Sequence, residues 1–76
     1  MVSTSFPTSH ELEIRVHART GRRVRNLAVE LMPEGIVLKG HTASYYVKQL
    51  AQEEVCDLVP HIRLLNAIVV QREANN

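Results

Sequence analysis

The stretch that decides the fold is "LAVELMPEGIVLKG", residues 27–40. On both sides of its centre, apolar residues recur at every second position: Leu27, Val29, Leu31, Ile36 and Leu38. A period of two residues is typical of a β-strand with one buried face. The Pro-Glu-Gly sequence between the two halves is typical of a turn, in which Gly35 supplies the positive φ that closes the loop. Residues 27–40 therefore predict a β-hairpin.

The overlapping stretch "GIVLKGHT", residues 35–42, nearly matches the phosphate-loop pattern G-x-x-x-x-G-K-[ST], with His41 in place of the lysine. A phosphate loop must curl so that its backbone N–H groups point inward. Three large apolar residues lie between the two glycines, and they favour an extended strand. We therefore predict no nucleotide site and no cofactor. Gly35 and Gly40 are assigned structural roles, with Gly40 ending the second strand where the chain enters a helix.

The segment before the hairpin carries signals of a helix at both of its ends. Leu12, Ile14 and Val16 would also fit the alternation of a strand, so the flanking residues must decide. Thr8 and Glu11 match a capping box, and Gly21 stands where a left-handed C-cap is expected. These signals predict a helix from about residue 9 to residue 20.

A second helix is predicted after Gly40, where either Thr42 or Ser44 can serve as its N-cap. Its apolar positions follow the helical period: Val47, Leu50, Ala51, Val55 and Leu58. Pro60 marks the region where it ends, and Cys56 is expected to be a buried thiol within it. The stretch that follows, residues 62–70, is rich in Ile, Leu and Val and predicts a third strand.

The predicted order α-β-β-α-β indicates a single small α+β domain over residues 9–71, with a flexible lead at 1–8 and a polar tail at 72–76. A crossover through the second helix returns the last strand parallel to a hairpin strand, which gives a three-stranded mixed sheet with both helices packed on one face. The opposite face is expected to be partly wet and open to a partner. It would carry Ala28, Glu30, Val37 and Lys39, together with either Leu65, Ala67 and Val69 or Leu64, Ile68 and Val70.

Composition restricts the class of protein further. The chain has 76 residues, a net charge of +1 and one cysteine, so it has neither a disulfide framework nor a global attraction to polyanions. The N-terminal residues do not resemble a secretory signal, and no apolar run is long enough to span a membrane. We expect a cytoplasmic location.

Basic residues gather in "RVHARTGRRVR", residues 15–25, which contains no acidic residue. Its five arginines are Arg15, Arg19, Arg22, Arg23 and Arg25. Guanidinium groups bind phosphate oxygens bidentately, so anionic phospholipid headgroups or nucleic acid are candidate ligands. The alternative is that they are solvated or neutralise a helix C-terminus. Recognition of single strands by stacking is disfavoured by the small number of aromatic residues in the chain.

Tyr45 and Tyr46 open the second helix, and adjacent helical positions cannot both face the core. One ring is therefore expected to be at least half exposed, either as an interaction surface or lying over the edge of its own sheet.

The four histidines lack the spacing of helical metal ligands, and acidic neighbours of Cys56 disfavour a reactive thiolate. We predict no metal site, no catalytic residues and no enzymatic activity.

Taken together, the segments "GIVLKG", "SYYVKQLAQEEV" and "VPHIRLLNAIVV" resemble the BON domain, a small bacterial module. The matching residues are Gly35, Ile36 or Val37, Leu38, Gly40, Pro60, Ile62, Leu65, Asn66, Ile68 and Val70. The family has a glycine where this chain has His61, so the turn before the last strand is expected to form without a free positive φ or to strain His61.

The resemblance implies the αββαβ fold and a binding role without catalytic residues. BON-like proteins are often periplasmic and are associated with phospholipid binding and protein contacts. We expect a non-enzymatic interaction module that contacts a protein partner or a second copy of itself, with anionic phospholipid headgroups as a further ligand. The alternative is a small nucleic-acid-binding protein that uses the Arg15 to Arg25 cluster, and no small-molecule substrate is expected.

Overall fold

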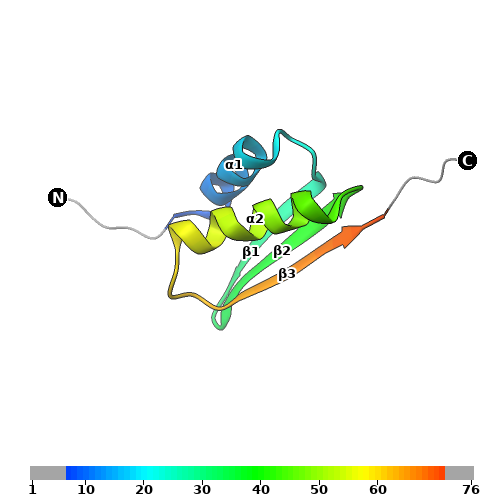
Figure 1. Cartoon of the computed structure of the whole chain (residues 1–76). Helices are drawn as coiled ribbons and strands as arrows, with labels where there is room; N and C mark the ends of the chain where they lie inside the picture. Colours follow the sequence, from blue (N-terminus) through cyan, green and yellow to red (C-terminus); the bar gives the residue numbers. More distant parts are fainter. Residues whose placement is uncertain (1–6, 72–76) are drawn as a thin grey trace, which may run out of the picture.

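The structure, a computed structural model, describes residues 7–71. Its elements follow in the order α1 (Ser9–Thr20), β1 (Arg25–Met32), β2 (Gly35–Thr42), α2 (Tyr45–Leu58) and β3 (Leu64–Val70) (Figure 1). The predicted αββαβ order is therefore confirmed. Of the predicted flexible lead, residues 1–6 lie outside the described residues, as does the predicted tail at 72–76.

The three strands form one mixed sheet in the order β1-β2-β3. β2 pairs antiparallel with β1 across the hairpin and parallel with β3. Both helices lie on the same face: α1 packs against β1 and α2, and α2 packs against β2 and β3 (Figure 1). This arrangement confirms the predicted sheet with two helices on one face.

Capping interactions fix both helices. The Thr8 hydroxyl accepts a hydrogen bond from the Glu11 backbone N–H, and the Glu11 carboxylate accepts one from the Thr8 N–H, each at 3.1 Å. Gly21 ends α1 in the left-handed conformation, with a φ of +67°. Of the two residues that could cap α2, Ser44 does so, because its hydroxyl accepts from the Val47 N–H at 3.3 Å. The predicted bounds of α1 are confirmed.

The core lies between the helices and the inner face of the sheet. Its buried apolar residues are Leu12, Val16, Val24, Val29, Ile36, Leu38, Val47, Ala51, Val55, Val59 and Ile68. The side chains of Leu38 in the central strand and of Leu12 in α1 are completely inaccessible to solvent. Every element contributes to this single core, so no part of the fold is independent of the rest.

Gly35 is needed mainly because another strand approaches it closely. It has the predicted positive φ, at +156°, but it is the first residue of β2 and pairs with Met32 across the connection formed by Pro33 and Glu34. A Cβ atom built on Gly35 would lie 2.2 Å from the backbone oxygen of Arg63, just before β3. Gly35 therefore permits the junction of β2 and β3 as well as the turn.

The prediction that Gly40 ends the second strand is wrong, because β2 continues to Thr42. Gly40 lies opposite an irregularity in β1 between Arg25 and Ala28, where Asn26 has a φ of +54°. A Cβ atom on Gly40 would lie 2.7 Å from the side chain of Val24. The residue is glycine because the bulged β1 strand passes directly over it.

The connection from α2 to β3 forms without strain at His61. Within residues 7–71, the residues other than glycine with positive φ are Arg22 and Asn26, so His61 keeps an ordinary conformation. The Ile62 N–H donates to the Val59 carbonyl oxygen at 3.2 Å, which closes the turn. The third strand begins at Leu64, two residues later than predicted.

None of the described helices is both long and apolar enough to cross a membrane.

Candidate functional site

The five predicted arginines divide into two groups, and the first group holds the helices together. Arg15 Nε lies 3.4 Å from Glu54 Oε2, and the Arg19 guanidinium contacts Glu54 at 3.0 Å and Glu53 at 3.3 Å. The Glu54 side chain is only 14% exposed. Arg15 and Arg19 of α1 therefore pair with α2, and their charge is largely neutralised. The sequence could not show this, because the partners are 34 to 39 residues apart.

The second group, Arg22, Arg23 and Arg25, lines a shallow hollow of about 420 Å³. The loop between α1 and β1 contributes Arg22 and Arg23, and the other wall is the segment Thr42, Ala43, Ser44 and Val47 at the start of α2. No carboxylate of residues 7–71 lies within ion-pair distance of these three guanidinium groups. We call this hollow and its seven lining residues the arginine groove.

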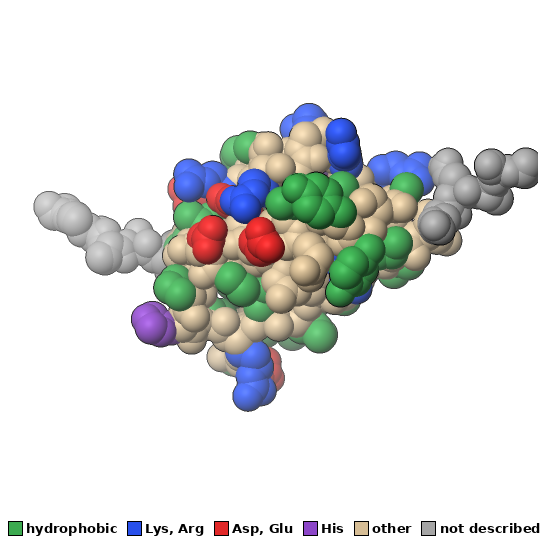
Figure 2. Space-filling view, viewed as in Figure 1, with side chains coloured by type: hydrophobic (Ala, Val, Ile, Leu, Met, Phe, Trp, Pro, Cys, Tyr) green, Lys and Arg blue, Asp and Glu red, His purple; other side chains and the backbone are tan. Residues whose placement is uncertain are grey.

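Local backbone geometry brings these arginines to one place. Gly21 and Arg22 both have φ near the left-handed region, at +67° and +60°, which reverses the chain after α1. Asn26 then adopts the same region within β1. The sequence signal for this geometry is present at Gly21 and Asn26, because glycine and asparagine are the residues that most readily adopt a positive φ, but not at Arg22. Figure 2 shows the basic side chains gathered over α1 and the loop after it, next to acidic side chains on α2.

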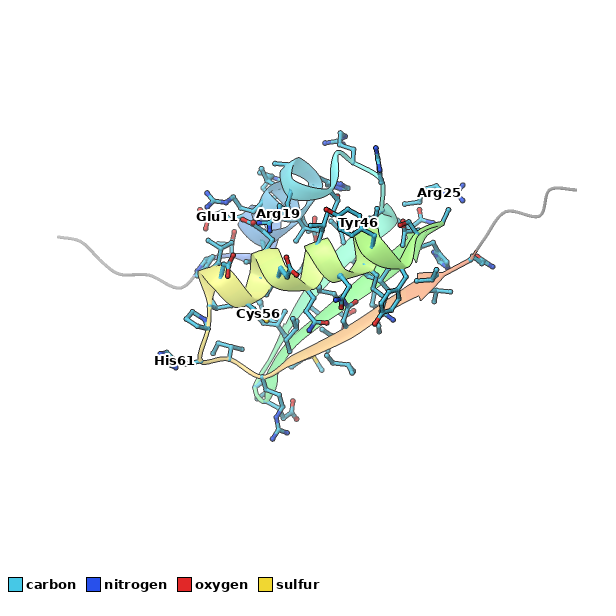
Figure 3. All side chains as sticks on the ribbon, in the orientation of Figure 1. Glu11, Arg19, Arg25, Tyr46, Cys56 and His61 are labelled. Atoms are coloured by element: carbon cyan, nitrogen blue, oxygen red, sulfur yellow. The ribbon has the colours of Figure 1, made fainter. Side chains whose placement is uncertain are left out.

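Both tyrosines are exposed, one more than predicted. Tyr45 is 64% and Tyr46 is 67% exposed in the first turn of α2. Tyr46 shares a side of the helix with Glu53, seven residues later, which contacts Arg19 of α1. Tyr45 shares a side with Gln52, which hydrogen-bonds β3 through Asn66. The two rings therefore point to different sides, with Tyr46 towards α1 and the loop that carries Arg22 and Arg23 (Figure 3).

The uncovered side of the sheet is the second candidate surface. The strand register places Glu30, Val37 and Leu65 in one row and Ala28, Lys39 and Ala67 in the next, followed by His41 and Val69. This resolves the alternative left by the sequence, because Leu65, Ala67 and Val69 face away from the helices. Leu65 is 60% and Val69 is 47% exposed, whereas Val37 is half-buried. We call these eight residues the open face; Lys39 and Glu30 form an ion pair there at 3.1 Å.

The free edge of β3 is partly closed by Asn66. Arg63 O accepts from the Ile36 N–H and the Gln71 N–H donates to Thr42 O, so odd-numbered residues of β3 bond to β2. The even-numbered residues direct their backbone groups outward. The Asn66 side-chain oxygen accepts from the outward Ile68 N–H at 3.2 Å, and its amide nitrogen donates to Lys48 O at 3.0 Å. This hydrogen bond satisfies one outward backbone N–H of β3, which is then not free to pair with a strand of another molecule.

Cys56 and the histidines do not form a metal-binding cluster within the described part of the chain. The expectation of a buried thiol is wrong, because Cys56 is exposed: the inner stripe of α2 is formed by Val47, Ala51 and Val55. Among residues 7–71, no three histidine, cysteine or acidic side chains lie close enough to share a metal ion. The chemistry that the site offers is therefore that of the arginine groove and of two exposed tyrosines.

No family model, characterised protein or solved structure matches the chain in comparisons of sequence and fold. The resemblance to the BON domain therefore stays a prediction that rests on the residues quoted for it. The αββαβ architecture itself is established by the structure.

Proposed function

We propose that this chain is a non-enzymatic, BON-like interaction module, located in the cytoplasm, whose arginine groove binds phosphate groups. The observation that carries the proposal is the convergence of Arg22, Arg23 and Arg25 on one hollow, with no carboxylate of the described residues paired to them. Uncompensated guanidinium groups attract phosphate, and each basic residue near an anionic membrane surface contributes about 1 kcal/mol to binding.

Anionic phospholipid headgroups are the ligand that the BON resemblance favours. Phosphodiesters of nucleic acid offer the same chemistry and are the alternative. In either case Arg15 and Arg19 are not part of the binding set, because both are paired with acidic residues of α2. The groove is shallow and lies at one end of the sheet, which suits a ligand on an extended surface better than a small molecule that must be enclosed.

The open face is proposed as the contact for a protein partner or a second copy of the chain. Its exposed Leu65 and Val69 offer apolar area, and the Lys39 and Glu30 pair adds polar contacts that fix orientation. Light scattering over a concentration series tests for self-association. A Leu65→Glu variant should reduce any association observed, and unchanged association would exclude this face as the contact.

Vesicle flotation tests the groove. We expect binding that increases with the fraction of anionic lipid and decreases with salt, and that Arg23→Glu weakens. Arg63→Glu is the matched control, because it makes the same charge change at an exposed arginine that lies outside the arginine groove. Equal loss of binding in both variants would mean that net charge, rather than the groove, causes attraction.

A further inference from the structure

We propose that the arginine groove and Tyr46 together form a site for single-stranded nucleic acid, with a base stacked on the Tyr46 ring and the adjoining phosphates held by Arg22, Arg23 and Arg25. This inference rests on the proposed function, because it names the ligand of the same groove. It differs from that proposal in assigning the phosphate to a polynucleotide and in giving the exposed aromatic ring a role.

The first step of the argument is the position of Tyr46. In the sequence Tyr46 lies between Ser44 and Val47, which both line the groove, and its ring is on the side of α2 that faces α1. Figure 3 shows it projecting from α2 on the side of α1, between the labelled Arg19 and Arg25. The ring is 67% exposed, so most of its surface is available to a ligand. An exposed ring beside a basic groove is the combination by which proteins bind single strands: bases stack on the ring and cations follow the backbone.

The second step is the chemistry of the surrounding residues. All three basic groups of the groove are arginines, whose planar guanidinium binds phosphate bidentately and also stacks on bases. Insertion into a membrane would favour exposed aliphatic side chains around the basic groups. The large exposed aliphatic side chains of the described residues are Ile14, Leu31, Met32, Leu65 and Val69, and none of them lines the groove, whose one exposed aliphatic residue is the small Ala43. The groove therefore fits a polynucleotide better than a bilayer.

The structure also predicts the kind of recognition. Stacking on one ring and contacts with phosphate do not distinguish bases well, so binding should tolerate many sequences. Three phosphate contacts to a single strand predict that the logarithm of the binding constant falls with the logarithm of salt concentration with a slope of about −2.

The experiment uses a short single-stranded oligonucleotide and an abasic strand of the same length and charge, with fluorescence anisotropy as the measurement. We expect the strand with bases to bind at least about 5-fold tighter than the abasic strand, which is the lower end of the contribution of one stacked base. Tyr46→Leu should remove this preference. Tyr45→Leu, which changes an equally exposed ring on the side of α2 that faces β3, should retain it.

Vesicles containing phosphatidylglycerol are titrated in parallel. Equal binding of the two strands to the wild-type chain, or equal effects of the two tyrosine substitutions, would overturn the stacking site. Binding to vesicles but to neither strand would also overturn it, while the phosphate-binding groove would stand with a lipid ligand. If no probe binds, or if Arg23→Glu and Arg63→Glu behave alike with every probe, both the inference and the proposed groove are wrong.

Discussion

Replacing Gly35 with alanine should destabilise the fold far more than the same change at Gly21. A Cβ atom at position 35 would lie 2.2 Å from the Arg63 backbone oxygen, and real Cβ atoms do not approach closer than 3.0 Å. Gly35 and Arg63 must therefore separate by about 0.8 Å, which breaks the 2.9 Å hydrogen bond from the Ile36 N–H to Arg63 O. Leaving these groups unpaired costs about 1–3 kcal/mol, and distorting the backbone costs a similar amount.

We therefore expect Gly35→Ala to reduce the free energy of unfolding by about 2–6 kcal/mol. This is a large part of the total of about 4–11 kcal/mol for a chain of 76 residues. Gly21 also has a positive φ, but its nearest neighbour would be the flexible Arg23 side chain at 3.9 Å, so Gly21→Ala should cost only about 1–2 kcal/mol. Urea unfolding followed by circular dichroism measures both values. A loss at position 35 no larger than that at position 21 would refute the argument from the close strand approach.

Three further predictions follow from the core, the helix pairing and the sheet edge. Leu38→Ala should cost about 2–5 kcal/mol in urea unfolding, because the central side chain is fully buried and leaves a cavity. Glu54→Ala should cost about 1 kcal/mol, and less at high salt, because it breaks the ion pairs to Arg15 and Arg19, whose guanidinium groups are partly exposed to solvent; a loss independent of salt would contradict this. Asn66→Ala should increase self-association in light scattering, because it frees an edge N–H; an unchanged mass would show that Asn66 does not protect the edge.

The sequence predicts the elements of this fold well because the signals for each of them are local. Thr8, Glu11 and Gly21 bracket α1 within a few residues of one another, and the structure contains each cap. The alternation of apolar and polar residues on both sides of Pro33 and Glu34 likewise identifies the hairpin. The order of elements then leaves few ways to arrange three strands and two helices.

The features that sequence reasoning missed depend on contacts between distant segments. Position 40 must be glycine because the Val24 side chain packs against it. Whether an arginine can bind a ligand depends on whether an acidic residue of α2 is paired with it. Nothing within residues 15–25 distinguishes Arg19, which is paired, from Arg23, which is not. Which face of β3 is open depends on its register with β2, because a shift of the register by one residue would exchange the two faces.

The parallel pairing of β2 with β3 also sets the order in which the protein can fold during synthesis. The hairpin and α1 make contacts that are short in sequence and can form early. Ile68, however, closes the core beside Gly40 and is separated from it by the whole of α2. Until β3 has left the ribosome, one edge of β2 and part of the inner side of α2 lack their partner, and exposed strand edges and apolar surface are the features that make partly folded chains prone to aggregation.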